Sequence, residues 1–214
     1  MNSVHGVSIL LTVLLACGCT IASRAEKADP ALLSRLSKTM AMDTQQTDAF
    51  DAQIWLMTMD PKLGRYVADP TERLQILKLT YREAHRNNLD PDLALAVMQI
   101  ESGFDHFAIS RVGAQGLMQV MPFWRLEIGR PQDNLTHIDT NIRYGITILS
   151  HYIEKSSGDL VEALARYNGS KGRLKYPEKV VHAWRRNWQT RLAHEIPELQ
   201  QGCKDYRLKA CRPF

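Results

Sequence analysis

The sequence predicts an all-α fold, and three features of the 214-residue chain support this prediction. Apolar residues recur every three or four positions in several segments, which is the period of an amphipathic helix. Asp-Pro pairs stand where two of these segments begin, as expected for an N-cap followed by proline at the first helical position. We see no strand pattern, repeat or low-complexity tract. The composition, 44% hydrophobic and 23% charged, excludes a polytopic membrane protein and a disordered chain.

The first helices are expected in the amino-terminal third of the chain. A short helix is predicted around residues 30–40, within a polar, alanine-rich lead-in. Residues 50–59 are predicted to form a second helix that ends at Asp60-Pro61. Asp69-Pro70 begins a longer helix with one apolar face. The residues of that face are Leu74, Leu77, Tyr81 and Ala84.

The third strong helix runs from Asp90 to Glu101. Residues 93–100 are almost wholly apolar, so this helix has hardly any polar face and should be central in the domain. Glu101 stands at its carboxyl end. Burial and the negative end of the helix dipole both disfavour a carboxylate there, so the pKa of Glu101 should rise toward the range that a general acid needs.

The segment after Glu101 is expected to be irregular. Residues 103–114 contain glycine, aspartate and serine without periodicity and should form a loop. Residues 115–121 are predicted to form a short helix that is stopped or restarted at Pro122, with one further turn over residues 123–128.

The second half of the chain predicts three more helices. Residues 139–155 form a clear amphipathic helix, and Gly158 ends that unit. Asp159, followed by Glu162, resembles a capping box that starts the next helix. A last helix begins at Pro177. Its apolar side consists of Val181, Trp184, Trp188 and Leu192.

The first 23 residues are typical of an export signal. No charged residue precedes Arg24, and the apolar stretch of residues 7–22 is short for a membrane-spanning helix. The positive charges usual before such a stretch are missing, so an uncleaved anchor is an alternative. Cys17 and Cys19 are two positions for the lipidation of a bacterial lipoprotein, and lipidation and simple secretion both stay open. A periplasmic location is expected, with outer-membrane attachment if a lipid is added.

The carboxyl-terminal segment, residues 193–214, is expected to be a basic tail held by a disulfide. Cys203 and Cys211 should pair in an exported protein. The positive charge gathers at this end, since residues 171–214 contain 11 Lys or Arg and 4 Asp or Glu. This charge is either a solvated face or an attraction to an anionic polymer or membrane surface. Nucleic acid is a poor partner, because no nucleic-acid-binding motif is present.

Four motifs stand out from the helical pattern. They are Ile100-Glu101-Ser102-Gly103, the segment from Ser110 to Pro122 with Gly113-Ala114-Gln115-Gly116-Leu117-Met118-Gln119, the helix start at Asn141-Ile142 to Gly145, and Tyr167-Asn168-Gly169. Each alone has a packing explanation, such as an exposed helix end, a tight turn or a core ring. Together and in this order they resemble the lytic transglycosylases of the soluble-lytic-transglycosylase (SLT) type. The resemblance covers about 100 residues, from Asp90 to roughly Val181.

The resemblance implies a lysozyme-like (goose-type) helical domain, over residues 65–192, with a groove that binds peptidoglycan. Residues 24–64 would be a tether and N-terminal helices. Glu101 would be the general acid at the bond between N-acetylmuramic acid and N-acetylglucosamine, and then the base that leads to a 1,6-anhydro ring. The groove residues that it implies are Ser102, Ser110, Gly116, Leu117, Met118, Gln119, Met121, Tyr167 and Asn168. The Tyr167 hydroxyl would point toward Glu101 or the reacting acetamido group.

The matched motifs contain a single carboxylate, which favours ring closure over hydrolysis. Asp105, four residues after Glu101, is the nearest rival for a second catalytic role. A muramidase of the same fold and a catalytically weak wall-binding accessory protein are the alternatives. Arg166 and the segment 169–172 depart from the usual family pattern, which puts the shape of the groove in question. We expect a monomer that needs no cofactor. We expect no metal site, because the histidines lack ligand-like spacing.

Overall fold

The computed structural model of this chain describes residue 34 and residues 49–127, 131–190 and 197–211. The export signal with Cys17 and Cys19, the helix expected around residues 30–40 apart from residue 34, and Leu192 lie outside the described residues. Within the described ranges the chain is helical and has no strand, only isolated β-bridges in the segment after Glu101. The all-α prediction is therefore confirmed.

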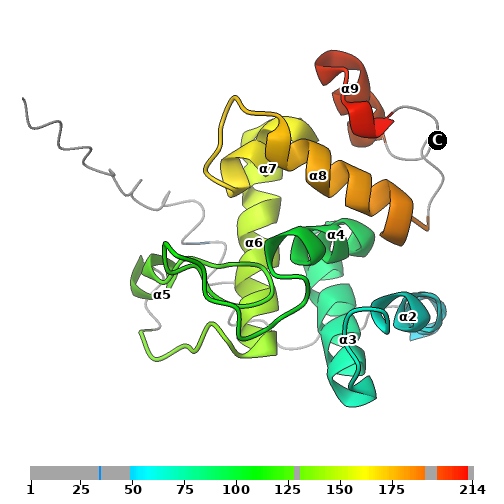
Figure 1. The fold of residues 1–214 in the computed structure, drawn as a ribbon, viewed down its shortest axis with the longest axis vertical. Coiled ribbons are helices and arrows are strands. Elements are labelled where there is room, and N and C mark those ends of the chain that lie inside the picture. Colours follow the sequence, from blue (N-terminus) through cyan, green and yellow to red (C-terminus); the bar gives the residue numbers. More distant parts are fainter. Residues whose placement is uncertain (1–33, 35–48, 128–130, 191–196, 212–214) are drawn as a thin grey trace, which may run out of the picture.

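The helices pack around one core. Figure 1 shows α3 and α6 side by side in the middle of the molecule, with α2 beside α3, α7 at one end of α6, and α8 beside α7 and α4. None of the helices in the described ranges combines the length and the hydropathy that crossing a membrane requires. Their bounds are α2 (Ala49–Leu63), α3 (Pro70–Arg86), α4 (Pro91–Glu101), α5 (Phe123–Glu127), α6 (Ile138–Lys155), α7 (Leu160–Tyr167), α8 (Lys175–Ala183), the π-helix η1 (Trp184–Trp188), α9 (Pro197–Tyr206) and the 3₁₀ turn η3 (Lys209–Cys211).

Helix α2 does not end at Asp60-Pro61, as the sequence predicted, but continues to Leu63. Proline lacks a backbone N–H, yet its φ is compatible with a helix. Trp55, Met59 and Leu63 lie four residues apart on one face, and all three are buried. The burial of this face keeps the helix intact for one turn beyond the point where the proline would otherwise end it.

Helix α3 begins as predicted, with the Asp69 carboxylate accepting a hydrogen bond from the backbone N–H of Thr71. Leu77, Tyr81 and Ala84 are buried on its inner face. Leu74 was predicted on the same face, but 43% of its surface is exposed. The inner face instead begins with Ile76, because this end of α3 projects beyond the helices that cover it.

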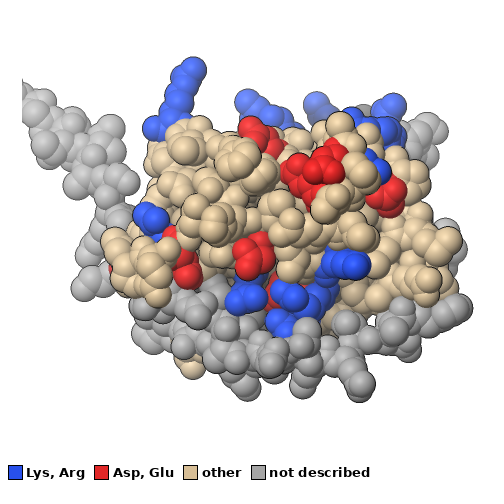
Figure 2. Space-filling view, turned by 90° about the horizontal axis from the view of Figure 1, so that it is seen from below, with Lys and Arg blue, Asp and Glu red and all other residues tan. Residues whose placement is uncertain are grey.

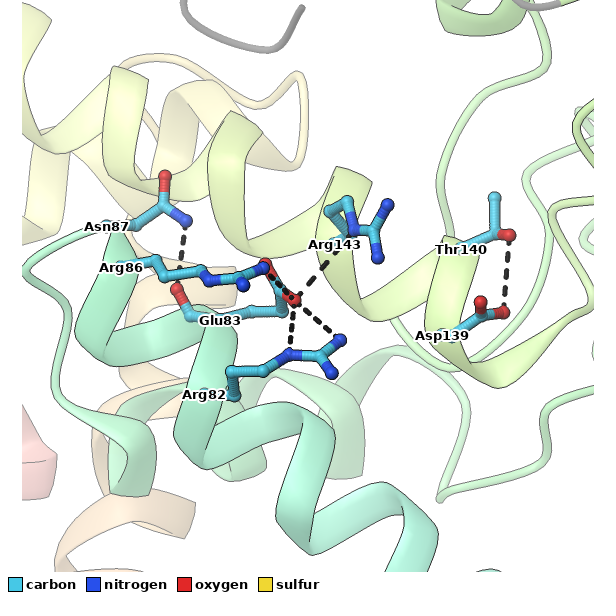
Figure 3. Close-up of polar contacts among 7 residues, drawn as sticks. All are labelled: Arg82, Glu83, Arg86, Asn87, Asp139, Thr140 and Arg143. Atoms are coloured by element: carbon cyan, nitrogen blue, oxygen red, sulfur yellow. Dashed lines mark hydrogen bonds and ion pairs between the residues drawn. The ribbon is translucent and has the colours of Figure 1, made fainter. Parts of the chain in front are cut away.

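Glu83 anchors α3 to α6 through a buried ion cluster. Its side chain is fully buried, and Oε1 lies 2.8 Å from Nη2 of Arg82, 3.2 Å from Nη1 of Arg86 and 3.8 Å from Nε of Arg143. Figure 3 shows the arginines of α3 and α6 converging on this one carboxylate. A buried charge needs such partners, so Glu83 has a role in packing the two helices together.

Helix α4 is the central helix, as its sequence predicted. Asp90 caps it by accepting a hydrogen bond from the backbone N–H of Asp92, and every residue from Asp92 to Met98 is buried. The helix ends at Glu101, after which Gly103 and Phe104 take positive φ values of 61° and 70°. The apolar run thus carries Glu101 from the core to the edge of the fold.

The short helix predicted for residues 115–121 is wrong. The segment is a set of tight turns, in which Gly116 and Gln119 have φ values of 74° and 48°, outside the helical region. Leu117 and Met118 are fully buried, and their apolar character imitates a helical pattern. The turns are followed by α5, which confirms the further turn predicted after Pro122.

Asn141 of α6 holds these turns against the core. Its fully buried amide donates to the carbonyl oxygens of Gln115 and Leu135, both at 2.7 Å, and accepts from the N–H of Met118 at 2.8 Å. A Cβ added to Gly116 would lie 2.4 Å from the Asn141 amide nitrogen. Contacts across the chain, and not a local helical preference, therefore fix the segment.

Helix α8 continues into the π-helix η1, and the aromatic residues predicted on its inner side form part of the core. Trp184 and Trp188 are 1% and 0% exposed. The Trp188 indole donates to the Gln99 side-chain oxygen on α4 at 2.7 Å, which joins α8 and η1 to the central helix. Trp184 and Trp188 are thus core residues, as their place on the apolar side of the predicted helix indicates.

The carboxyl-terminal segment packs on α7 and α8. Cys203 and Cys211 form a disulfide that joins α9 to η3, and Leu208 and Ala210 between them are buried. The Glu178 carboxylate of α8 accepts hydrogen bonds from the N–H groups of Lys209 and Ala210 at 2.6 and 3.2 Å. This segment is therefore a packed part of the described fold and not a free tail.

Candidate active site

Glu101 lies at the carboxyl end of α4, where the turns after α4 and the helices α7 and α8 meet. Its side chain is half-buried. The phenol of Tyr176, at the start of α8, donates a hydrogen bond of 2.6 Å to its Oε1 atom. The residue pair is 75 positions apart in the chain, so the contact depends on the packing of α8 against α4.

The environment of Glu101 raises the pKa of its carboxyl group from 4.5 to about 7. Burial is the main cause, because it disfavours the ionised form, and the hydrogen bond from Tyr176 acts in the opposite direction. The pKa of the Tyr176 phenol itself is raised well above its ordinary value by burial and by the nearby Glu101. Tyr176 therefore stays a donor, while Glu101 is poised to gain or lose a proton near neutral pH.

A cavity of about 250 Å³ opens on one side of Glu101. Five of the residues implied by the sequence motifs line it together with Glu101. They are Ser110, Gln119, Met121, Tyr167 and Asn168. Trp124 and Ile148 add apolar surface. No charged residue other than Glu101 occurs among its described lining residues, so the cavity suits a neutral, hydroxyl-rich ligand with apolar ring faces.

Ser110 and Gln119 offer polar groups to this cavity from the turns after α4. The Ser110 hydroxyl oxygen accepts a hydrogen bond from the N–H of Ala114 at 3.0 Å, so its proton remains to be donated. The Gln119 amide nitrogen donates to the carbonyl oxygens of Ala108 and Gly116 at 3.2 and 3.0 Å. These bonds orient the amide oxygen of Gln119 as an acceptor for a ligand.

Tyr167 and Asn168 close the cavity from the end of α7. The Tyr167 hydroxyl was expected to point toward Glu101 or the ligand, but in the structure it donates to the carbonyl oxygen of Met118 at 2.8 Å. Burial and the nearby Glu101 raise the pKa of this phenol well above its ordinary value. Tyr167 thus ties α7 to the turns, and the hydrogen bond to Glu101 comes from Tyr176 instead.

Four of the residues implied as groove residues do not line the cavity. The Ser102 hydroxyl is bound within the chain, donating to the carbonyl oxygen of Leu117 at 2.8 Å and accepting from the N–H of Phe104 at 3.1 Å. Gly116, Leu117 and Met118 are buried. Beneath them Gly145 lets α6 approach closely, since a Cβ added there would lie 2.5 Å from Met118. These residues support the cavity from behind.

Tyr176 is the site residue that the sequence motifs missed. The last helix was predicted to start at Pro177, one residue after Tyr176, whereas α8 starts at Lys175 in the structure. A tyrosine beside a helix-starting proline has many structural explanations, and no local pattern shows that it faces Glu101. A donor to Glu101 was expected, but it was assigned to Tyr167.

Asp105, the rival second carboxylate, does not line the cavity beside Glu101. It is exposed, and its side chain accepts a hydrogen bond from the N–H of Phe107 at 2.8 Å. Among the described residues, Glu101 is the only carboxylate that lines this cavity or a second one, on the Tyr176 side of Glu101. The same part of the chain contains no group of three or more histidine, cysteine or acidic residues that could hold a metal ion.

Comparison with known proteins identifies similar chains. The "Membrane-bound lytic murein transglycosylase C" of Actinobacillus pleuropneumoniae is 44% identical over 48 residues, which is 22% of this chain and 13% of that protein. The "Transglycosylase" of Enterobacteria phage PRD1 is 35% identical over 101 residues, 44% of this chain and 37% of that protein. The chain thus matches well under half of the length of these relatives.

One solved structure with similarity is an inactive mutant of the lytic transglycosylase Slt from Pseudomonas aeruginosa. It aligns at 21% identity with a TM-score of 0.43 and covers 86% of this chain and 38% of that chain. The sequence model of the Transglycosylase SLT domain matches residues 78–187, just over half of the chain, and this range includes Glu101 and every residue that lines the cavity of 250 Å³. On this match the chain belongs to the SLT transglycosylase domain family.

Proposed function

We propose that this chain is a lytic transglycosylase of bacterial peptidoglycan. It cleaves the β-1,4 bond between N-acetylmuramic acid and N-acetylglucosamine and leaves a 1,6-anhydro-muramic end. The observation that carries the proposal is Glu101, a half-buried carboxyl group with a pKa near 7 and without a second carboxylate among the described residues that line its cavities. The SLT family and the names of the relatives support the substrate.

The reaction needs one group that first gives and then takes a proton. The protonated Glu101 gives its proton to the glycosidic oxygen as the bond between that oxygen and C1 of the muramic sugar breaks. The resulting carboxylate removes the proton from the C6 hydroxyl of the same sugar, and the C6 oxygen bonds to C1. No water is consumed, and Glu101 is protonated again for the next cycle.

The cavity of about 250 Å³, whose described lining has no charged residue besides Glu101, binds the sugar in this scheme. Ser110 has a hydroxyl proton to donate, and Gln119 has an amide oxygen that accepts from sugar hydroxyls. Met121 and Trp124 provide apolar surface for a ring face. Tyr176 holds the Glu101 carboxylate in one orientation during the interval in which it is ionised.

Mass spectrometry of the fragments released from purified sacculi tests the chemistry. The wild-type chain is expected to give anhydro ends, which are one water lighter than reducing ends. Reducing ends alone would instead establish a muramidase. Glu101→Gln should lower product release at least about a thousandfold, since it removes the carboxyl group that protonates the glycosidic oxygen. Equal release by both proteins would refute the role of Glu101.

The proposed location is the periplasm, where the peptidoglycan lies. The relatives' names include membrane-bound lytic transglycosylases, which agrees with attachment through Cys17 or Cys19. Labelling cells with a radioactive fatty acid tests the attachment directly. Label that is lost when Cys17 or Cys19 is replaced by alanine would establish a lipoprotein, and an unlabelled protein would exclude the lipid anchor.

A further inference from the structure

A second cavity, on the Tyr176 side of Glu101, has a wall of cations. It encloses about 370 Å³, and its charged lining residues besides Glu101 are Arg173, Lys175 and Lys179. All three are exposed to solvent. Within the described residues, no carboxylate forms a salt bridge with any of them. The wall therefore presents positive charge that this part of the chain does not neutralise.

The positive surface continues along α8 away from Glu101. A third cavity, of about 770 Å³, shares Ile100 and Lys179 with the second and adds Arg186 and Lys209. We call these two adjoining cavities the basic groove. Its apolar floor includes Ile100, and its cations come from three elements: the loop before α8, α8 with η1, and the carboxyl-terminal segment. They are Arg173, Lys175, Lys179, Arg186 and Lys209.

Glu178 is the only acidic residue besides Glu101 among the described residues that line the basic groove, and its carboxylate is already bound. It accepts the N–H groups of Lys209 and Ala210 at 2.6 and 3.2 Å. These bonds hold the disulfide-closed segment against α8 and bring Lys209 to the groove. The charge that faces a ligand in this groove is therefore mainly positive.

This charge differs from that of the other surfaces. The cavity with Ser110 and Gln119 has no charged lining residue except Glu101 in the described part of the chain. On the face shown in Figure 2, basic side chains lie beside acidic ones. The pKa of Glu101 is shifted by burial and by Tyr176, and the groove cations are not among the causes. No described carboxylate, Glu101 included, forms a salt bridge with these cations, so their charge is open to a ligand.

We propose that the basic groove binds the carboxylates of the stem peptide carried by muramic acid. The inference rests on the proposed function, because it takes the glycan to lie across Glu101. The peptide starts at the lactyl group of the muramic sugar, near the bond that is cleaved, and a peptide that leaves this point along α8 follows the groove. Cations spread over two cavities match several carboxylates along a chain better than the single lactyl carboxylate of a peptide-free strand.

The recognition is tested by removing two groove charges from the full chain. In Lys175→Gln combined with Lys179→Gln, both substitutions are at exposed positions and should leave the fold intact. The matched control, Lys78→Gln combined with Lys204→Gln, removes two exposed charges outside the groove. The groove variant should raise KM for soluble, peptide-bearing glycan strands about five- to tenfold with little change in kcat, and the control should not.

Two further substrates identify the carboxylate. Strands stripped of peptide by an amidase keep only lactyl carboxylates, and peptide-bearing strands with chemically amidated carboxyl groups keep the peptide without its charge. The groove variant should lose its KM defect on both. An equal defect on stripped strands would assign the groove to the lactyl carboxylate, and an equal defect on amidated strands would exclude charge recognition. Either result overturns the proposal, as does an unchanged KM on peptide-bearing strands.

A binding measurement separates this proposal from the reaction itself. The isolated acidic stem tetrapeptide carries a fluorescent label, and its anisotropy is followed as the Glu101→Gln protein, which keeps the groove cations, is added. The same titration is made with the groove variant and with the matched control. Binding that weakens in the groove variant, but not in the matched control, supports recognition even if the products of the wild type prove to be reducing ends. Equal binding by all three proteins, or none, would refute the groove even where anhydro products confirm the reaction.

Discussion

Glu83 is fully buried and Glu101 half-buried, and the two glutamates differ in the groups that face their carboxylates. Three guanidinium groups lie within 4 Å of Glu83 Oε1, at distances from 2.8 to 3.8 Å. Glu101 receives one hydrogen bond, from the neutral Tyr176, and no described cation forms a salt bridge with it. A buried carboxylate with positive charges beside it supports packing. A carboxylate that lacks such partners has a raised pKa and can serve in proton transfer near neutral pH.

The largest effect on stability is expected when the matched carboxylate is removed. Glu83→Gln leaves three arginines near a buried site without their counter-charge, and it should lower the free energy of unfolding by roughly 3 to 5 kcal/mol. Urea denaturation at pH 7 measures this loss. Glu162→Gln is the control, because it breaks the partly exposed pair with Arg166 on α7 and should cost less than about 1 kcal/mol.

The contrast fails if the two substitutions have equal effects. Such a result would mean that the desolvation of Glu83 already cancels the attraction of its arginines. Glu83 would then contribute no more to the free energy of unfolding than the partly exposed Glu162.

The unmatched carboxylate should respond in the opposite direction. The pKa of Glu101 is about 7 in the folded chain and 4.5 without burial, so its favourable contribution is complete below pH 4.5 and is lost as the pH rises through 7. Glu101→Gln cannot ionise. Relative to the wild type it should therefore gain stability between pH 5 and pH 8, reaching at most about 3 kcal/mol.

Thermal unfolding followed at pH 5 and at pH 8 measures this difference. The midpoint of the Gln variant should exceed that of the wild type at pH 8 by more than at pH 5. A constant difference between the two pH values would show that the carboxyl group titrates normally. In that case the raised pKa could not support the role of Glu101 as an acid.

A smaller effect is expected from the hydrogen bond to Glu101. Since Tyr176 favours the ionised form, Tyr176→Phe should raise the pKa of Glu101 further. The fall of kcat/KM on the alkaline side, expected near pH 7 in the wild type, should then move upward by about one pH unit or less. Tyr167→Phe, which loses a bond to Met118 instead, should leave this limb in place. If the alkaline limb moved in Tyr167→Phe and not in Tyr176→Phe, the hydrogen bond to Glu101 would be assigned to Tyr167 instead.

How far the sequence predicts this molecule depends on whether the determining contacts are local. The central helix follows from its own apolar residues and from the Asp90-Pro91 start, and the structure confirms it. The turns after α4 do not, because Leu117 and Met118 look helical until Asn141, more than twenty residues away, binds the backbone around them. Pro61 is the reverse case, since buried neighbours carry α2 through a residue that locally predicts its end.

The sequence predicts one side of the candidate site and not the other. Glu101, Ser110, Gln119, Met121, Tyr167 and Asn168 meet around one cavity, and the sequence motifs had singled out all six. The basic groove and Tyr176 could not be found in this way. Their residues come from the loop after α7, from α8 and η1, and from the carboxyl-terminal segment. The packing of α8 on α4 brings Tyr176 and Lys179 beside Glu101, and the carboxyl-terminal segment adds Lys209 farther along α8.

The smallest effect is expected at a third carboxylate, and it sharpens the comparison of the other two. Asp105 is neither buried nor paired with a cation in the described part of the chain, and its carboxylate accepts a hydrogen bond from the N–H of Phe107. Asparagine can accept the same bond, so Asp105→Asn should change kcat/KM less than about twofold and stability by less than about 0.5 kcal/mol. A loss of activity near a hundredfold would make Asp105 a second catalytic carboxylate, and the reaction would then need water or a covalent intermediate instead of ring closure by Glu101 alone.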